Sequence, residues 1–177
     1  MIAYPDNVGS LADYIESVLQ KYADKPAYTA LGQTLTFKDI DEKSSALARY
    51  FVHTAKLQAG DRIAIQLPNL IQNPIAVYAA LRAGLVVVNT NPLYTEREMK
   101  HQFTDSGATA LVILSDLMPK FDAIKDDTHI TTVIATSATE LLDASTAPNI
   151  EGTVSLTRAV EEGKDLPTFE RAKIDIG

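Results

Sequence analysis

Residues 60–114, GDRIAIQLPNLIQNPIAVYAALRAGLVVVNTNPLYTEREMKHQFTDSGATALVIL, decide the fold of this chain. Short apolar runs alternate there with stretches of helical periodicity. The runs cover residues 62–67, 85–88 and 109–114. In the first run Ile63, Ile65 and Leu67 alternate and should point the same way, as a strand requires. The continuous, valine-rich run at 85–88 predicts a parallel strand that is buried on both faces.

The helices between these strands carry signals at their ends. Asn73-Pro74 predicts a helix start. The Asn side chain accepts hydrogen bonds from the free N–H groups of the first turn, and Pro suits the first helical position because its missing N–H costs nothing there. Gly84 predicts the end of that helix. Arg82 is the one charge within residues 74–83, so we expect an interior helix that is covered on most sides.

The second helix of the stretch begins with a capping box. Thr95 and Glu98 stand three residues apart, and Tyr94 is placed to pack on Met99 as a hydrophobic staple. Ser106-Gly107 predicts the end of this helix.

The flanking segments extend the pattern. Ser10 should cap an amphipathic helix. Gly32-Gln33 should form the turn of a small hairpin. Thr36 should cap a second helix, which ends near residues 53–56. Downstream, residues 116–126 predict a helix and 131–135 a fourth parallel strand. The signal weakens after Thr136, where residues 154–162 hold one short strand or helix.

The order β-α-β-α-β-α-β predicts an α/β fold: a doubly wound, mostly parallel sheet with flanking helices and a small N-terminal hairpin. We expect a single subdomain, 1–177; a family resemblance, carried by the motifs quoted below, implies that it is part of a larger multi-subdomain N-terminal domain. Its parts are the N-terminal helices and hairpin (1–56), the β-α-β core (60–136) and a loop-rich tail (137–177).

Composition narrows the class of protein. The chain is 46% hydrophobic and 22% charged, as a globular protein is, and it contains no Cys. Disulfides, thiolate metal sites and thiol redox catalysis are therefore not expected. The net charge of −7 makes nucleic acid an unsuitable partner. We see no signal peptide and no apolar run that could span a bilayer, so we expect a cytoplasmic protein.

Few side chains suggest chemistry. His101 has Asp105 one helical turn away, which allows a general base, although Arg97 nearby also fits an ordinary surface charge network. His53 and His129 are more simply caps or solvated side chains. The glycines at 84 and 107 do not form a dinucleotide fingerprint.

Asparagines and tyrosines leave two interpretations open. Asn69, Asn89 and Asn91 follow strands, at the edge where open α/β sheets bind ligands, yet they also serve as turn formers. Some tyrosines fall on apolar faces and suit a core better than the lining of a ligand tunnel. They are Tyr14, Tyr22, Tyr28 and Tyr78. We predict no catalytic, cofactor-binding or metal-binding residue in this chain.

The segments LTFKDIDEKSSALARYF, GDRIAIQLPN and LRAGLVVVNTNPLYTEREMKHQFTDSGATALVI carry a family resemblance over residues 10–135. In their order and spacing they resemble the amino-terminal region of adenylate-forming enzymes, and most closely bacterial long-chain fatty acid–CoA ligases. The resemblance implies a lipid-metabolic ligase (acyl-CoA synthetase): a fatty acid and ATP give an acyl-adenylate, and CoA then displaces AMP. It also implies ATP, Mg²⁺ and CoA for the full-length enzyme.

In that family the phosphate loop, the ATP-binding motifs and the catalytic Lys lie downstream of the matched region, and none occurs here. We therefore expect an inactive N-terminal fragment whose partner is the remainder of its own polypeptide. A homodimer and peripheral association with the inner membrane stay open for the full-length enzyme. Longer members of the family have a basic, amphipathic segment before the phosphate loop, whereas residues 146–163 here are shorter and acidic, which argues against membrane docking through this segment. Alternatives are an aryl or medium-chain acyl ligase, and a non-enzymatic flavodoxin-like binding module.

Overall fold

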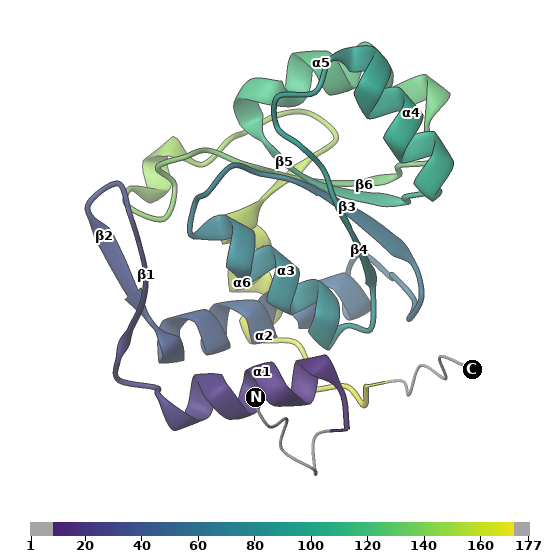
Figure 1. The fold of residues 1–177 in the computed structure, drawn as a ribbon. Helices are drawn as coiled ribbons and strands as arrows, with labels where there is room; N and C mark the ends of the chain where they lie inside the picture. Colours follow the sequence, from purple (N-terminus) through teal and green to yellow (C-terminus); the bar gives the residue numbers. More distant parts are fainter. Residues whose placement is uncertain (1–8, 172–177) are drawn as a thin grey trace, which may run out of the picture.

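A computed structural model describes residues 9–171 of the chain (Figure 1). The helices are α1 Leu11–Lys21, α2 Phe37–His53, α3 Gln72–Arg82, α4 Glu96–Ser106, α5 Met118–Asp122 and α6 Leu156–Lys164. The strands are β1 Pro26–Ala30, β2 Gln33–Thr36, β3 Arg62–Gln66, β4 Val86–Asn89, β5 Ala110–Leu114, β6 Thr132–Thr136 and β7 Val154–Ser155. Short 3-10 turns lie at Ser115–Leu117, Lys125–Asp127 and Ala144–Thr146.

The main sheet has five parallel strands in the order β4-β3-β5-β6-β7 (Figure 1). The chain starts this sheet at β3, adds β4 on one side, then crosses back and adds β5, β6 and β7 on the other side. This reversal makes the sheet doubly wound. The antiparallel pair β1–β2 forms a separate small hairpin. The predicted fold class is therefore confirmed.

Helices cover both faces of the sheet and divide the core into two clusters. On one face α2, α3 and α6 pack against Ile63 and Ile65 of β3. On the other face α4 and α5 enclose Ala64, which is fully buried. The two isoleucines share a cluster with Leu67, as their alternation predicts.

Helices α2 and α6 approach each other unusually closely. A Cβ atom built on Gly163 would lie 2.0 Å from the backbone oxygen of Ala46, so only glycine fits this position. The Gly163 carbonyl accepts a hydrogen bond from Arg49 Nε at 2.8 Å. Residues 154–164 thus hold both a strand and a helix, where the sequence predicted one or the other.

Helix α3 is the centre of the helical layer. Its residues Ile75, Ala76, Ala79 and Ala80 are fully buried against α2 and the sheet. Arg82 forms salt bridges with Glu16 of α1, at 3.1 Å, and with Asp41 of α2. Its charge is thus compensated where α1, α2 and α3 meet.

The predicted start of α3, with Asn73 as the cap and Pro74 as the first helical residue, is wrong by two residues. The helix begins at Gln72, after Ile71, which makes no side-chain capping bond. Asn73 Nδ2 instead donates to the Leu67 carbonyl at 3.3 Å. The side chain thereby holds the loop after β3, a contact that local helix signals do not encode.

The prediction that residues 85–88 are buried on both faces is also wrong. Strand β4 lies at the edge of the sheet, where Val86 is 44% exposed. A valine-rich run reports a preference for extended backbone, but the position of a strand within its sheet depends on the order of crossovers.

Most helix caps agree with the sequence. Ser10 caps α1 through the Asp13 N–H, and Thr36 with Asp39 forms a capping box at α2. Residues 115–127 are more broken than predicted, since α5 is flanked by 3-10 turns.

The capping box of α4 gives a first testable prediction. Thr95 Oγ1 accepts from the Glu98 N–H, and the Glu98 carboxylate accepts from the Thr95 N–H at 2.8 Å. That backbone bond holds the pKa of Glu98 below its usual value. Thr95→Ala should cost about 1 kcal/mol in a denaturant titration, whereas Thr95→Ser should keep most of the stability. A loss below a few tenths of a kcal/mol would show that the cap does not stabilise α4.

Candidate functional site at the carboxyl ends of β3 and β4

The carboxyl ends of β3 and β4 meet at one edge of the sheet, as neighbouring parallel strands must. There the loops after both strands enclose a hollow of about 570 Å³. Its lining is Leu67, Pro68, Asn69, Asn73, Asn89, Thr90, Asn91, Pro92, Leu93 and Tyr94. The structure thus brings together the predicted strand-end asparagines, Asn69, Asn89 and Asn91, and adds Asn73.

The side chains of two of these asparagines form hydrogen bonds that stabilise the loops after β3 and β4. Asn91 Oδ1 accepts from the Leu93 N–H at 2.9 Å, so Asn91 forms the turn after β4. Asn73 fixes the loop after β3. Asn69 and Asn89 are exposed at the rim. Asn91 is therefore a turn former, as one interpretation of the sequence has it, while Asn69 and Asn89 remain exposed residues of the hollow's lining.

Two glutamines, one of them fully buried, hold the backbone of the strand ends and loops at this edge. Gln66, fully buried, donates from Nε2 to the Asn91 carbonyl at 3.2 Å. Gln102 of α4 donates to the Asn89 carbonyl at 3.2 Å. Within residues 9–171 the Oε1 atoms of both glutamines are buried without a partner. Sequence reasoning missed both residues, although a polar side chain inside the apolar run of β3 was a usable signal for Gln66.

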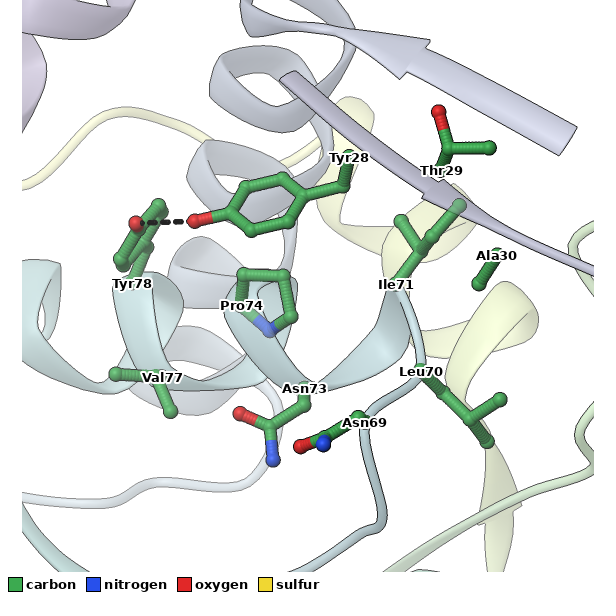
Figure 2. Close-up of a pocket in the computed structure, with 10 residues that line it drawn as sticks. All are labelled: Tyr28, Thr29, Ala30, Asn69, Leu70, Ile71, Asn73, Pro74, Val77 and Tyr78. Carbon is green, nitrogen blue, oxygen red and sulfur yellow. Dashed lines mark hydrogen bonds between the residues drawn. The ribbon is translucent and has the colours of Figure 1, made fainter.

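A second hollow, of about 460 Å³, adjoins the first (Figure 2). Asn69 and Asn73 line both. Tyr28 of β1 and Tyr78 of α3 form its far wall, with their hydroxyl oxygens 2.8 Å apart. Burial and this hydrogen bond raise the pKa of Tyr78 well above its usual value. The Tyr78 phenol is thus neutral at physiological pH. Both tyrosine rings pack against the core cluster and also line this hollow.

Tyr14 and Tyr22, the other two tyrosines predicted to lie in the core, do not line this hollow. Tyr22 is half-buried with its ring 6.0 Å from that of Phe37. Tyr14 is 37% exposed, so its assignment to the core is wrong. The apolar stripe of α1 is narrower than its periodicity indicates, because α1 lies outside α2 and α3 and buries only one side.

The histidines do not form a site in the described part of the chain. His101 and Asp105 are both exposed and share no hydrogen bond; the neighbouring Lys100 pairs with Asp127 at 2.7 Å instead. His53 packs edge-on against Phe169, with 6.1 Å between ring centroids. His129 is exposed. The surface interpretation of the His101 helix face therefore fits better than a general base.

The sequence analysis did not predict the burial of one carboxylate, that of Glu140. Glu140, 1% exposed, accepts from Thr136 Oγ1 at 2.8 Å and from the Thr157 N–H at 3.3 Å. Burial raises the pKa of this carboxyl group. Thr157 lies in the first turn of α6, so Glu140 joins the loop after β6 to the start of that helix. This is a structural role.

The two hollows are electrically neutral. Their linings contain no Lys, Arg, His, Asp or Glu. Among residues 9–171 no group of three or more His, Asp or Glu side chains could hold a metal ion. A triphosphate needs cationic groups and Mg²⁺ needs carboxylates. The residues present at this edge therefore do not fit ATP or Mg²⁺ by themselves.

Comparison with known proteins gives the family. A profile described as AMP-binding enzyme matches residues 15–169, which is most of the chain. The chain belongs to the AMP-binding enzyme family. The predicted resemblance to adenylate-forming enzymes is confirmed.

Curated members of this family resemble the chain at the sequence level. A long-chain-fatty-acid–CoA ligase of Escherichia coli O6:H1 is 39% identical over 163 residues, which cover 92% of this chain and 29% of that protein. One from Yersinia pestis is 43% identical over 141 residues, 80% of this chain and 25% of that protein. The chain therefore spans less than a third of the length of these relatives.

Solved structures of the family share the fold. A long-chain-fatty-acid-CoA ligase from Archaeoglobus fulgidus superposes with a TM-score of 0.76 at 24% identity, over 98% of this chain and 33% of that one. A benzoate CoA ligase from Burkholderia xenovorans gives 0.75 at 19% identity, over 93% and 30%. Among residues 9–171 none of the helices has the length and hydrophobicity that spanning a bilayer requires.

Proposed function

We propose that this chain is the amino-terminal part of an ATP-dependent long-chain fatty acid–CoA ligase. The observation that carries the proposal is the 39% identity to a curated ligase of that name over 92% of the chain. We therefore assign the chain to the lipid-metabolic branch of its family.

The proposed reaction has two steps. A fatty acid carboxylate oxygen attacks the α-phosphorus of ATP, pyrophosphate leaves, and an acyl-adenylate forms. The CoA sulfur then attacks the acyl carbonyl carbon, and AMP leaves. Mg²⁺ neutralises the triphosphate in the first step. The neutral hollows of this chain supply none of these charges, so we place the catalytic groups in the remainder of the longer polypeptide.

The role of this chain is then to be a scaffold. Its sheet presents the loops after β3 and β4 at one edge, where the remainder of the polypeptide completes a site. The division into parts 1–56, 60–136 and 137–177 also stays a proposal, as do a cytoplasmic location, a homodimer and peripheral membrane association of the longer enzyme.

The test is a comparison of two polypeptides. The 177-residue chain, incubated with palmitate, ATP, Mg²⁺ and CoA, should release no AMP above buffer, and calorimetry should show no ATP binding with a Kd below about 1 mM. A polypeptide continued through the length of the curated relatives should release AMP. Turnover by the short chain that survives His101→Ala would contradict this division of labour.

Substrate choice tests the second candidate, an aryl or medium-chain acyl ligase. The observation that favours it is the shared fold of the benzoate CoA ligase. The longer polypeptide should prefer palmitate to octanoate and to benzoate when kcat/KM values are compared. A preference for benzoate would move the chain to the aryl branch of the family. The flavodoxin-like binding module is disfavoured by the family match.

A further inference from the structure

We propose that residues 137–142, directly after β6, form a pH-sensitive latch that closes when Glu140 carries a proton and opens when Glu140 is charged. These six residues, here called the latch segment, connect β6 to the 3-10 turn at Ala144–Thr146. They contact the start of α6, the start of α3 and the small hairpin. The latch belongs to the chain itself and does not depend on the proposed ligase activity.

The latch segment buries its charged residue and exposes an apolar one. The Glu140 side chain is 1% exposed, whereas Leu142 is 48% exposed. Leu141 is half-buried, and Ala138 and Thr139 are exposed. Apolar burial therefore contributes little to the attachment of this segment, and polar bonds hold it in place. A segment with few buried apolar contacts opens at a low cost in free energy.

Glu140 forms its hydrogen bonds through one oxygen. Oε1 accepts from Thr136 Oγ1 at 2.8 Å and from the Thr157 N–H at 3.3 Å. Oε2 is buried and has no partner among residues 9–171. A buried charged oxygen without a donor costs more free energy than a neutral hydroxyl in the same position. A proton on Oε2 would remove the charge and leave both bonds of Oε1 in place.

No cation compensates Glu140 in the part of the chain that the structure describes. Strands β1, β2, β6 and β7 contain no charged residue. The other charged and titratable groups of the neighbouring elements have partners of their own: Arg158 with Glu162, Lys164 with Glu161, Arg82 with Glu16 and Asp41, Tyr28 with Tyr78, and Asp143 with the Ser145 N–H. Burial raises the pKa of the Glu140 carboxyl group, and its hydrogen bonds only partly oppose the rise.

The direction of the pH effect follows from the two environments of Glu140. In the open form the carboxyl group is hydrated and keeps its ordinary pKa. In the closed form the pKa is higher, so the closed form binds the proton more tightly. The latch is therefore most stable below the ordinary pKa of a glutamate, at about pH 4, and it weakens as the pH rises through the raised pKa of the closed form.

Two glutamines connect the latch segment to the walls of the hollow in Figure 2. Gln72, the first residue of α3, donates from Nε2 to the Ser137 carbonyl at 2.9 Å, and α3 forms one wall. Gln33 of β2 donates to the Leu141 carbonyl at 2.8 Å. It pairs in the hairpin with Ala30, which lines the hollow from the other side. Opening of the latch breaks both bonds, so the hairpin and α3 are then held together by fewer contacts.

Amide hydrogen exchange in the 177-residue chain tests the latch. The Thr157 N–H is bonded to Glu140 and should be released when the latch opens. The Arg158 N–H is bonded to Ser155 Oγ at 3.2 Å and is the internal control. After division by the intrinsic exchange rate, the Thr157 rate should rise on the order of tenfold between about pH 5 and about pH 8, while the Arg158 rate stays constant. The same pH dependence at both amides would overturn the proposal.

A matched pair of substitutions identifies the group that titrates. Glu140→Gln keeps the shape and one acceptor oxygen but cannot ionise, so Thr157 exchange should lose its pH dependence. Asp143→Asn removes an exposed carboxylate from the adjoining turn, keeps an acceptor for the Ser145 N–H, and should leave that pH dependence unchanged. Parental pH dependence in Glu140→Gln would show that another group controls the opening. If Glu140→Gln fails to fold, the two amides of the parent still decide the question.

The connection to the hollow has its own readout. In an NMR titration of the parent, the side-chain amide resonances of Gln33 and Gln72 should shift with the same midpoint as the Thr157 amide. In Glu140→Gln they should not shift over this pH range. Glutamine resonances that stay constant in the parent while Thr157 titrates would refute the effect of the latch on the hollow.

Discussion

Gly163→Ala should destabilise this protein by about 3 kcal/mol, the upper end of the usual cost of overpacking a core. The reason is geometric: the new Cβ would lie 2.0 Å from the Ala46 oxygen and 2.6 Å from its carbonyl carbon. Backbone atoms cannot rotate away as a side chain can. Helices α2 and α6 must separate, and the bond from Arg49 to the Gly163 carbonyl lengthens or breaks.

A thermal melt measures this effect, with a decrease in Tm of about 6–12 °C expected for a chain of this size. The substitution also removes a helical glycine, which alone would stabilise α6 by up to about 1 kcal/mol. Glu161→Ala, at an exposed position of the same helix, is the matched control and should change the midpoint little. If the Tm of Gly163→Ala equalled or exceeded that of the parent, the separation of α2 and α6 would have no cost in stability, and the prediction would be wrong.

Ala79→Asp should be more damaging, at about 3–5 kcal/mol, enough to unfold many domains. Ala79 is fully buried in α3, and the described residues around it belong to the apolar cluster. A carboxylate there would lose its hydration and find no cation. Circular dichroism and denaturant titration at neutral pH measure the loss.

Two comparisons make the Ala79→Asp result specific. Val77→Asp places the same charge on the half-buried side of α3 that lines the groove, and it should cost less. Protonation neutralises a carboxyl group whose pKa is raised by burial, so the deficit of Ala79→Asp relative to the parent should shrink as the pH falls toward 4. A small, pH-independent deficit would show that α3 is accessible to water.

Much of this fold could be predicted because its signals are local. The capping box at Thr95 and Glu98, the left-handed Gly107 and the alternation around Ile63 each depend on residues within one turn or one strand. The fold class then follows from the order of these elements. Family membership followed from motif spacing, which comparison with known proteins confirmed.

What escaped prediction depends on contacts distant in sequence. The edge position of β4, the use of Asn73 by the loop after β3, and the buried Glu140 all follow from how elements pack. Of the candidate site, the shared edge of Asn69, Asn89 and Asn91 could be anticipated, because carboxyl ends of parallel strands meet. The supporting glutamines could not, since their partners lie 25 and 13 residues away.

Because α2 packs closely against α6, the packing of α2 can be completed only after α6 has been synthesised. Residues 37–53 leave the ribosome early, yet the face of α2 that includes Ala46 is covered only when residues 156–164 arrive. At translation rates of about 5–20 residues per second, that surface stays open for about 5–20 s. During this interval the apolar face of α2, which is buried in the folded protein, can bind chaperones and other nascent chains. Helix α6 thus acts as the closing element, and mutations that weaken it should lower soluble yield more than they lower the stability of protein already folded.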